Sequence, residues 1–141
     1  AIKRRMNLTD KDLEIFAKTI WGESRGEVLE AKRAVACVIL NRFNSGKWFG
    51  GDSISAVCLM PYQFSCWNKN DPNRIKLDAV TFKDSSYRDC LAVAAGALTG
   101  LFKDASQYGT HYHVRGILPD WAKEKTPCAV AGRHLFYNSI P

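Results

Sequence analysis

The sequence has no apolar run of the roughly 18 residues that a transmembrane helix requires. A signal-peptide pattern, an internal repeat and a low-complexity tract are also missing. We therefore predict a chain without a membrane span. Because the sequence begins at Ala1 and not at methionine, a leader or a larger module upstream stays open.

The usual zinc-binding motifs are missing as well. Neither a C-x-x-C pair nor an H-E-x-x-H motif occurs, and the chain has only three histidines. The remaining hint of a metal site is the pair His111 and His113, with Cys128 and His134 further on. A lone H-x-H pair more often reflects alternating residues of an extended segment. We therefore expect no metal and no cofactor, and keep a zinc site as an alternative.

Cysteine usage gives no disulfide framework. The five cysteines are an odd number, so at least one is unpaired in a monomer. Cys37 and Cys90 lie within apolar helical patterns, where a thiol packs like a small hydrophobic side chain. These features favour folding in a reducing compartment.

Positive charge exceeds negative charge, with 20 Lys and Arg against 14 Asp and Glu, a formal net charge of +6. The excess indicates an anionic partner or surface, such as a bacterial wall, lipopolysaccharide or nucleic acid. Apart from a run at residues 3–5 the basic residues are scattered, and no helix-turn-helix, zinc-finger or RNP-like signature accompanies them. We therefore expect no specific nucleic-acid binding.

The length fits one small domain. A chain of 141 residues can bury one core and is too short for two ordinary domains. We predict a single domain over residues 1–141, with residues 1–8 as a flexible N-terminal arm, and a monomer.

The most informative segment surrounds Glu23. Thr9 and Asp12 form a capping-box pattern, and apolar residues follow it at helical spacing. This predicts a helix that ends at about Trp21, with Gly22 as its C-terminal cap. Glu23 then follows the negative end of the helix dipole, beside an apolar ring. Both features favour a protonated carboxyl, which makes Glu23 a candidate general acid.

The plain alternative is a solvated helix start. Glu23 and Glu27 lie four residues apart with Arg25 between them, which is typical of a local ion pair. Glu27 is a possible secondary carboxylate. Its expected place at the start of the next helix favours instead a helix-dipole partner or a link to Arg25.

Three further helices follow from apolar periodicity. We predict them over residues 27–44, 53–59 and 86–98, with Gly46 and Gly100 beyond the ends of the first and last. Residues 103–141 are expected to be irregular, with a short strand or helix within residues 129–137. These elements predict a helix-dominated α+β domain.

Several motifs together resemble a known family. Residues 19–27 (TIWGESRGE), then residues 34–42 (AVACVILNR), are similar to the opening motif of the SleB/CwlJ-type cell-wall hydrolases. This family includes spore cortex-lytic enzymes and several phage endolysins. The central QFS element is matched at residues 63–65, with Trp67 after it. The C-terminal block is matched by Thr110, His111, Tyr112, His113, Pro119, Trp121, Gly132, His134, Phe136 and Tyr137.

The chain departs from the family pattern in two places. Ser24 stands where the family usually has alanine, which is a small change. Residues 68–86 carry no family signature, and substrate preference is expected to be set there.

The resemblance implies a lysozyme-like fold, related to lytic transglycosylases, and an enzyme that degrades peptidoglycan. The implied reaction cleaves the β-1,4 bond between N-acetylmuramic acid and N-acetylglucosamine. In the family the first glutamate of the opening motif is the catalytic acid, which is Glu23 here. A lytic transglycosylase needs only this carboxylate, because the C6 hydroxyl of the muramic residue attacks its own C1 and forms a 1,6-anhydro ring.

Sugar contacts are expected from aromatic and polar side chains of the matched motifs, since pyranose faces pack on aromatic rings. The expected substrate-binding residues are Gln63, Phe64, Ser65, Trp67, Tyr112, His113, Trp121 and Tyr137. About half of the aromatic ones are expected to pack in the core.

Two other functions stay open beside this one. A zinc-dependent amidase or peptidase would use His111 and His113, and a non-catalytic wall-binding module would not need Glu23. The expected partners are peptidoglycan strands and anionic outer-membrane or wall polymers. We expect synthesis in the cytoplasm and action on the cell wall, with a phage endolysin preferred over a spore enzyme.

Overall fold

The computed structural model describes residues 7–141. The predicted N-terminal arm lies outside the described residues except for Asn7 and Leu8, which are exposed and belong to no helix or strand. In chain order the elements are α1 (Asp10–Ser24), α2 (Leu29–Ser45), η1 (Trp48–Gly50), α3 (Ile54–Leu59), η2 (Ser65–Trp67), α4 (Arg74–Ala79), α5 (Ser85–Thr99), β1 (His111–Val114), η3 (Asp120–Ala122), β2 (Ala129–Ala131) and β3 (His134–Tyr137).

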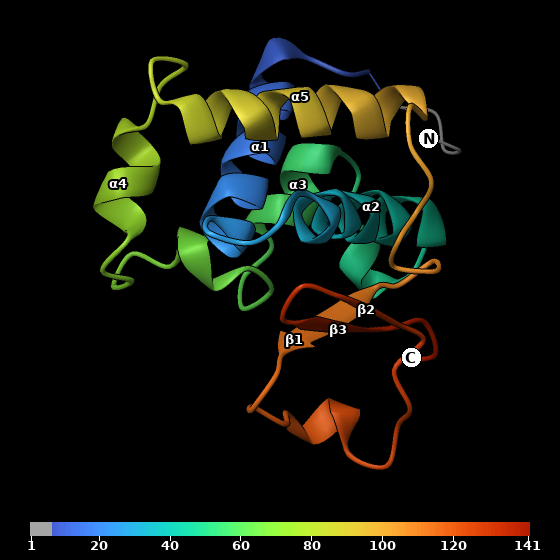
Figure 1. Ribbon diagram of the computed structural model, residues 1–141. Helices are drawn as coiled ribbons and strands as arrows, with labels where there is room; N and C mark the ends of the chain where they lie inside the picture. The colour runs from blue at the N-terminus through green and yellow to red at the C-terminus, as the bar shows by residue number, and fades with distance from the viewer. Residues whose placement is uncertain (1–6) are drawn as a thin grey trace.

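The helices pack together, and the small sheet lies against α2 (Figure 1). Helix α5 crosses both α1 and α2, and the buried residues between these helices form the main core. Burial of each large apolar side chain contributes about 1.5–3 kcal/mol. A second cluster joins α2 to the sheet through Ala31, Ala34, Val38, Ala131 and Phe136. The architecture is the helix-dominated α+β fold that the sequence predicted.

The start of α1 confirms the capping box. The Thr9 hydroxyl accepts from the Asp12 amide at 3.1 Å, and the Asp12 carboxylate accepts from the Thr9 amide at 3.0 Å. These bonds satisfy amides that the first turn leaves unpaired.

The predicted end of α1 is wrong. The helix continues through Gly22 to Ser24, so Glu23 lies inside its last turn and not after a glycine cap. The Ser24 hydroxyl donates to the Ile20 carbonyl at 2.5 Å, and Gly26 takes the positive φ of 88° that turns the chain away. Gly22 is needed for close packing, because a Cβ there would lie 2.8 Å from the Cβ of Cys66.

The other helices deviate from prediction mainly at their starts. Helix α2 begins two residues later than expected and ends at the left-handed Gly46 as predicted. Helix α3 agrees with the prediction, and Ser53 caps it. Helix α5 begins at Ser85 because the Asp84 carboxylate accepts from the Tyr87 amide at 3.0 Å. Helix α4 lies in the segment without a family signature and was not predicted.

The C-terminal third holds an antiparallel sheet with strand order β1-β3-β2. Strands β2 and β3 fall within the expected 129–137 segment, whereas β1 lies where irregular structure was expected. Tyr112 pairs with Phe136, and His111 pairs with Tyr137. Since side chains alternate along a strand, Tyr112 and His111 lie on opposite faces of the sheet.

All five cysteines lie within the described residues, and all are unpaired. Four of them are buried, and Cys90 packs in the main core as the sequence predicted. Cys37 is buried as well, with its thiol near Asp104. Burial raises the pKa of the Cys58 thiol to about 12 and that of the Cys90 thiol to about 11. Over residues 7–141, no helix has the length and apolar character needed to span a bilayer.

Candidate active site

Glu23 is partly exposed in the last turn of α1. Desolvation by the surrounding protein raises the pKa of its carboxyl, which favours the protonated form. Trp21 does not supply the apolar wall that was expected beside Glu23. That indole is buried in the core, and its Nε1 donates to the Ser86 hydroxyl on α5 at 2.8 Å.

Tyr112 on β1 reaches Glu23 across the gap between sheet and helix. Its hydroxyl donates to Glu23 Oε1 at 2.5 Å. Burial, followed by the nearby Glu23 charge, raises the pKa of Tyr112 well above its ordinary value. The phenol therefore stays protonated and acts as a donor. This bond opposes desolvation and lowers the pKa of Glu23.

Arg42 on α2 supplies positive charge to the same place. Only 5% of the residue is exposed, and its charge also lowers the pKa of Glu23. Its Nε donates to the Thr110 carbonyl at 2.6 Å, and its Nη1 donates to Gln63 Oε1 at 2.9 Å. The guanidinium lies 5.0 Å from the ring centroid of Phe64. Arg42 thus links α2 to the 63–65 segment and to the start of the strand that carries Tyr112.

Cys66 in η2 completes the surroundings of Glu23. Hydrogen bonds from its backbone and its thiol to the Glu23 carboxyl lower the pKa of that carboxyl. The pKa of the Cys66 thiol is itself raised, first by burial and then by Glu23. Sequence reasoning missed the roles of Cys66 and Arg42. Their only signal was a place inside or beside the matched motifs.

An open cavity of about 290 Å³ lies beside Glu23. Its lining residues are Glu23, Arg25, Gly26, Glu27, Val114, Arg133 and His134. The cavity therefore brings both candidate carboxylates and two arginines to one space. An acid with a raised pKa that faces such a space can protonate a bound leaving group.

Glu27 lies in the turn before α2, not in its first helical turn. Its Oε1 is 3.4 Å from Nδ1 of His134, and only 14% of its side chain is exposed. The expected link to Arg25 is thus replaced by a histidine partner from β3. Burial lowers the pKa of His134, although the Glu27 charge acts in the opposite direction.

The QFS residues divide into three environments. Gln63 is held by Arg42, Phe64 is buried in the main core, and Ser65 is exposed. Trp67 is turned toward α1, where its indole donates to the Thr19 hydroxyl at 2.9 Å. Phe64 and Trp67 therefore pack within the protein beside the Glu23 region.

His113, Trp121 and Tyr137 lie on the sheet face opposite Tyr112. The Tyr137 hydroxyl and His113 Nε2 are 2.8 Å apart, and their rings stack with centroids separated by 5.4 Å. The Trp121 ring centroid lies 5.2 Å from that of Tyr137. These three predicted substrate contacts form a separate aromatic cluster, and the structure does not bring them to the Glu23 cavity.

The histidines do not converge on a common point. His111 packs between Phe49 and Trp121, His113 faces Tyr137, and His134 faces Glu27. Within residues 7–141 no group of three His, Cys, Asp or Glu side chains has the arrangement of a metal site. The geometry gives the zinc alternative no ligand set among these residues.

Comparison with known proteins adds independent findings. A family model described as cell wall hydrolase matches residues 26–137. Spore cortex-lytic enzymes from Oceanobacillus iheyensis and Bacillus subtilis are 40% and 37% identical to this chain over 57 residues, which is 40% of the chain. The matched segment is 20% and 18% of their respective lengths, so this chain spans well under two thirds of these curated relatives.

Two solved structures have the same fold. The catalytic domain of the germination-specific lytic transglycosylase SleB from Bacillus anthracis gives a TM-score of 0.73 at 22% identity, covering 94% of this chain and 98% of that one. The catalytic domain of the Bacillus cereus SleB protein gives 0.68 at 22% identity, covering 94% and 93%. This likeness confirms the lysozyme-like architecture that the motifs implied.

Proposed function

Because the chain belongs to the cell wall hydrolase family, we propose that it cleaves the β-1,4 bond between N-acetylmuramic acid and N-acetylglucosamine as a lytic transglycosylase, with Glu23 as its acid and base. The family match begins at residue 26, three residues after Glu23. The role of Glu23 therefore rests on its own geometry and on the motif around it.

One observation carries the proposal: the 2.5 Å hydrogen bond from Tyr112 to Glu23 Oε1 beside an open cavity. The bond fixes the orientation of the carboxyl beside the cavity. Desolvation keeps the proton on the carboxyl until a substrate accepts it, because the pKa of Glu23 is raised.

In the first step Glu23 gives its proton to the glycosidic oxygen. The bond between C1 of the muramic residue and that oxygen breaks, and the leaving N-acetylglucosamine keeps the proton as its new hydroxyl. Positive charge develops at C1, as in other glycosidic cleavages. Glu23 is now a carboxylate, which Tyr112, Cys66 and Arg42 stabilise since each lowers its pKa.

In the second step the Glu23 carboxylate takes the proton of the C6 hydroxyl of the same muramic residue. The freed oxygen forms a bond to C1 and closes the 1,6-anhydro ring. Glu23 ends in the protonated form in which it started. Water is not the nucleophile, so this route needs no second carboxylate, whereas ordinary hydrolysis uses one.

The remaining site residues hold the substrate or the catalytic group. We assign substrate contact to Ser65, which is exposed, and to Gln63, whose amide Arg42 holds through its oxygen. Phe64 and Trp67 support this segment by packing. The aromatic cluster of His113, Trp121 and Tyr137 stays a predicted glycan contact on the far face of the sheet.

The wider biological setting is also proposed. Peptidoglycan strands are the expected partner, and the net charge of +6 favours anionic wall polymers around them. A single catalytic domain, synthesis in the cytoplasm and a phage endolysin origin stay predictions from the sequence.

The test is mass spectrometry of the fragments that wild type and Glu23→Gln release from purified peptidoglycan. We expect 1,6-anhydro-muramic ends from wild type and none from the variant. Reducing muramic ends would show hydrolysis and contradict the transglycosylase route. Cut peptides with intact glycan, unaffected by the substitution, would contradict the whole assignment.

A further inference from the structure

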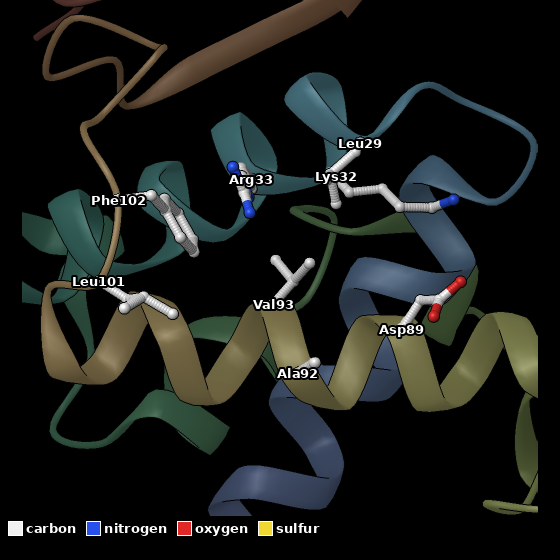
Figure 2. Close-up of a pocket in the computed structure, with 8 residues that line it drawn as sticks. All are labelled: Leu29, Lys32, Arg33, Asp89, Ala92, Val93, Leu101 and Phe102. Atoms are coloured by element: carbon white, nitrogen blue, oxygen red, sulfur yellow. The ribbon is translucent and has the colours of Figure 1, made fainter.

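A second cavity, of about 490 Å³, lies between α2 and α5. Figure 2 shows its lining residues, which are Leu29, Lys32, Arg33, Asp89, Ala92, Val93, Leu101 and Phe102. It shares no lining residue with the Glu23 cavity. Its volume is in the range of small-ligand sites.

Arg33 places a guanidinium in the wall of this cavity. Its Nε is buried and has no hydrogen-bond partner among the described residues. The guanidinium lies 4.8 Å from the ring centroid of Phe102, and Figure 2 shows it in the space between the two helices. Because Nε is buried, a ligand in the cavity would meet the terminal nitrogens of the guanidinium.

The charged neighbours leave Arg33 available. Lys32 adds positive charge, although its Nζ also donates to the Glu27 carbonyl at 3.1 Å. Asp89 is exposed, and Figure 2 shows it on the Lys32 side of the cavity, away from Arg33.

An adjoining cavity of about 540 Å³ shares Leu29, Arg33 and Phe102 with the first. Its charged lining adds Glu30, Lys103 and Asp104. The carboxylate of Asp104 already accepts from Asn41 at 2.9 Å and from Ser106 at 2.6 Å. Glu30 is exposed, and Lys103 adds further positive charge.

The remaining walls are apolar. Leu101 is 76% exposed, and Ala92, Val93 and Phe102 continue the same surface. An exposed apolar wall beside one guanidinium suits a ligand with an aliphatic body and a terminal carboxylate, because Arg binds carboxylates with paired hydrogen bonds. A phosphate would leave these walls without contact.

We propose that this α2–α5 cavity binds the carboxylate end of a peptidoglycan peptide stem. Arg33 pairs with the carboxylate, while Leu101 and Phe102 cover the aliphatic side chains. The inference rests on the proposed function, since such stems are attached to the muramic residues of the glycan that Glu23 is proposed to cleave.

The test is an NMR titration of the ¹⁵N-labelled protein with the stem tetrapeptide L-Ala-γ-D-Glu-L-Lys-D-Ala. We expect saturable shifts of the Arg33, Val93 and Phe102 amides. The same peptide with a C-terminal amide should bind at least ten times more weakly. Arg33→Gln should weaken binding at least tenfold as well, whereas Lys125→Gln, an equal charge change at an exposed site after η3, should not. Ala92→Leu should weaken binding by filling the cavity without a change of charge.

Absent saturation in wild type, equal affinity for the amidated peptide, or displacement by millimolar inorganic phosphate would each overturn the proposal. Cleavage of glycan strands stripped of their peptides separates this result from the proposed function. Arg33→Gln should cleave stripped strands at the wild-type rate and lose any preference for strands that carry peptides. Glu23→Gln should cleave neither and still bind the tetrapeptide.

Discussion

Gly22 and Cys66 are in such close contact that a Cβ on Gly22 would lie 2.8 Å from the Cβ and 2.9 Å from the Sγ of Cys66. This contact explains a glycine within α1, although glycine is a poor helix former. The contact places η2 next to the residue before Glu23, so the Cys66 backbone and thiol can reach the Glu23 carboxyl.

We expect Gly22→Ala to lower both stability and activity, although alanine is the better helix former. Alanine gains about 1 kcal/mol in a helix over glycine, but overpacking costs about 1–3 kcal/mol. Net destabilisation should appear in urea unfolding, together with slower peptidoglycan cleavage. Adding Cys66→Gly should recover part of the stability, because it removes the atoms that collide. A Gly22→Ala protein that is more stable than wild type would show that the contact is not tight.

Tyr112→Phe should shift the pH dependence of cleavage. The Tyr112 bond lowers the pKa of Glu23, so its loss should raise that pKa and move the alkaline limb of kcat/KM to higher pH. The rate should fall about 10- to 100-fold, since the carboxyl also loses its orientation. Tyr87→Phe, at a buried tyrosine on α5, should leave the profile in place. An unchanged alkaline limb in Tyr112→Phe would mean that Glu23 is not the titrating acid.

Desolvation of the Glu23 carboxyl should also make stability depend on pH. The folded pKa is raised above the ordinary 4.5, so the unfolded chain ionises first as pH rises. The free energy of unfolding of wild type should therefore fall as pH rises from about 4.5 through the folded pKa, at up to about 1.4 kcal/mol per pH unit. Glu23→Gln cannot ionise and should gain on wild type over this window. Urea unfolding at pH 4 and pH 8 measures the difference, and a constant difference would contradict the raised pKa.

Arg42→Lys should lower both stability and activity. Lysine keeps the charge but cannot donate to Thr110 and Gln63 in the planar geometry of a guanidinium. Loss of charged hydrogen bonds costs about 1.5–3 kcal/mol each, and less where the amine replaces one of them. Arg88→Lys is a matched control because Arg88 donates to two backbone carbonyls at an exposed site. Equal effects of the two substitutions would argue against a special role for Arg42.

The sequence predicted those parts of the fold that are encoded locally. The capping box at Thr9 and the glycine ends at Gly46 and Gly100 depend on a few neighbouring residues. The role of Gly22 was predicted wrongly because a glycine is needed there for close contact with Cys66, which lies far along the chain. A local pattern cannot distinguish a glycine that ends a helix from one that allows close packing.

The candidate site was predictable only through its motifs. Glu23 and Tyr112 were both named, but the bond between them joins residues 89 positions apart, and only the fold brings them together. His113 lies on the sheet face opposite Tyr112 because side chains alternate along a strand. Had β1 been predicted, that alternation would have separated His113 from Tyr112, whereas the face of Tyr137 also depends on the pairing of β3 with β1.

Glu27→Gln decides between one carboxylate and two. Glu27 shares the cavity of Glu23, and its Oε1 lies 3.4 Å from His134 Nδ1. Glutamine keeps the shape and removes the charge. If Glu23 acts alone, the variant should still form 1,6-anhydro ends, with kcat within about tenfold of wild type, whereas Glu23→Gln should lose about 10²–10⁴-fold.

For Glu27→Gln, mass spectrometry of the released fragments identifies the product ends, and cleavage rates on purified peptidoglycan give kcat. Glu14→Gln, at a surface ion pair on α1, controls for the loss of one negative charge. A collapse of activity in Glu27→Gln comparable to that in Glu23→Gln, together with reducing ends from wild type, would assign Glu27 the role of base. Such a result would make the enzyme a two-carboxylate hydrolase, with the second carboxylate beside His134.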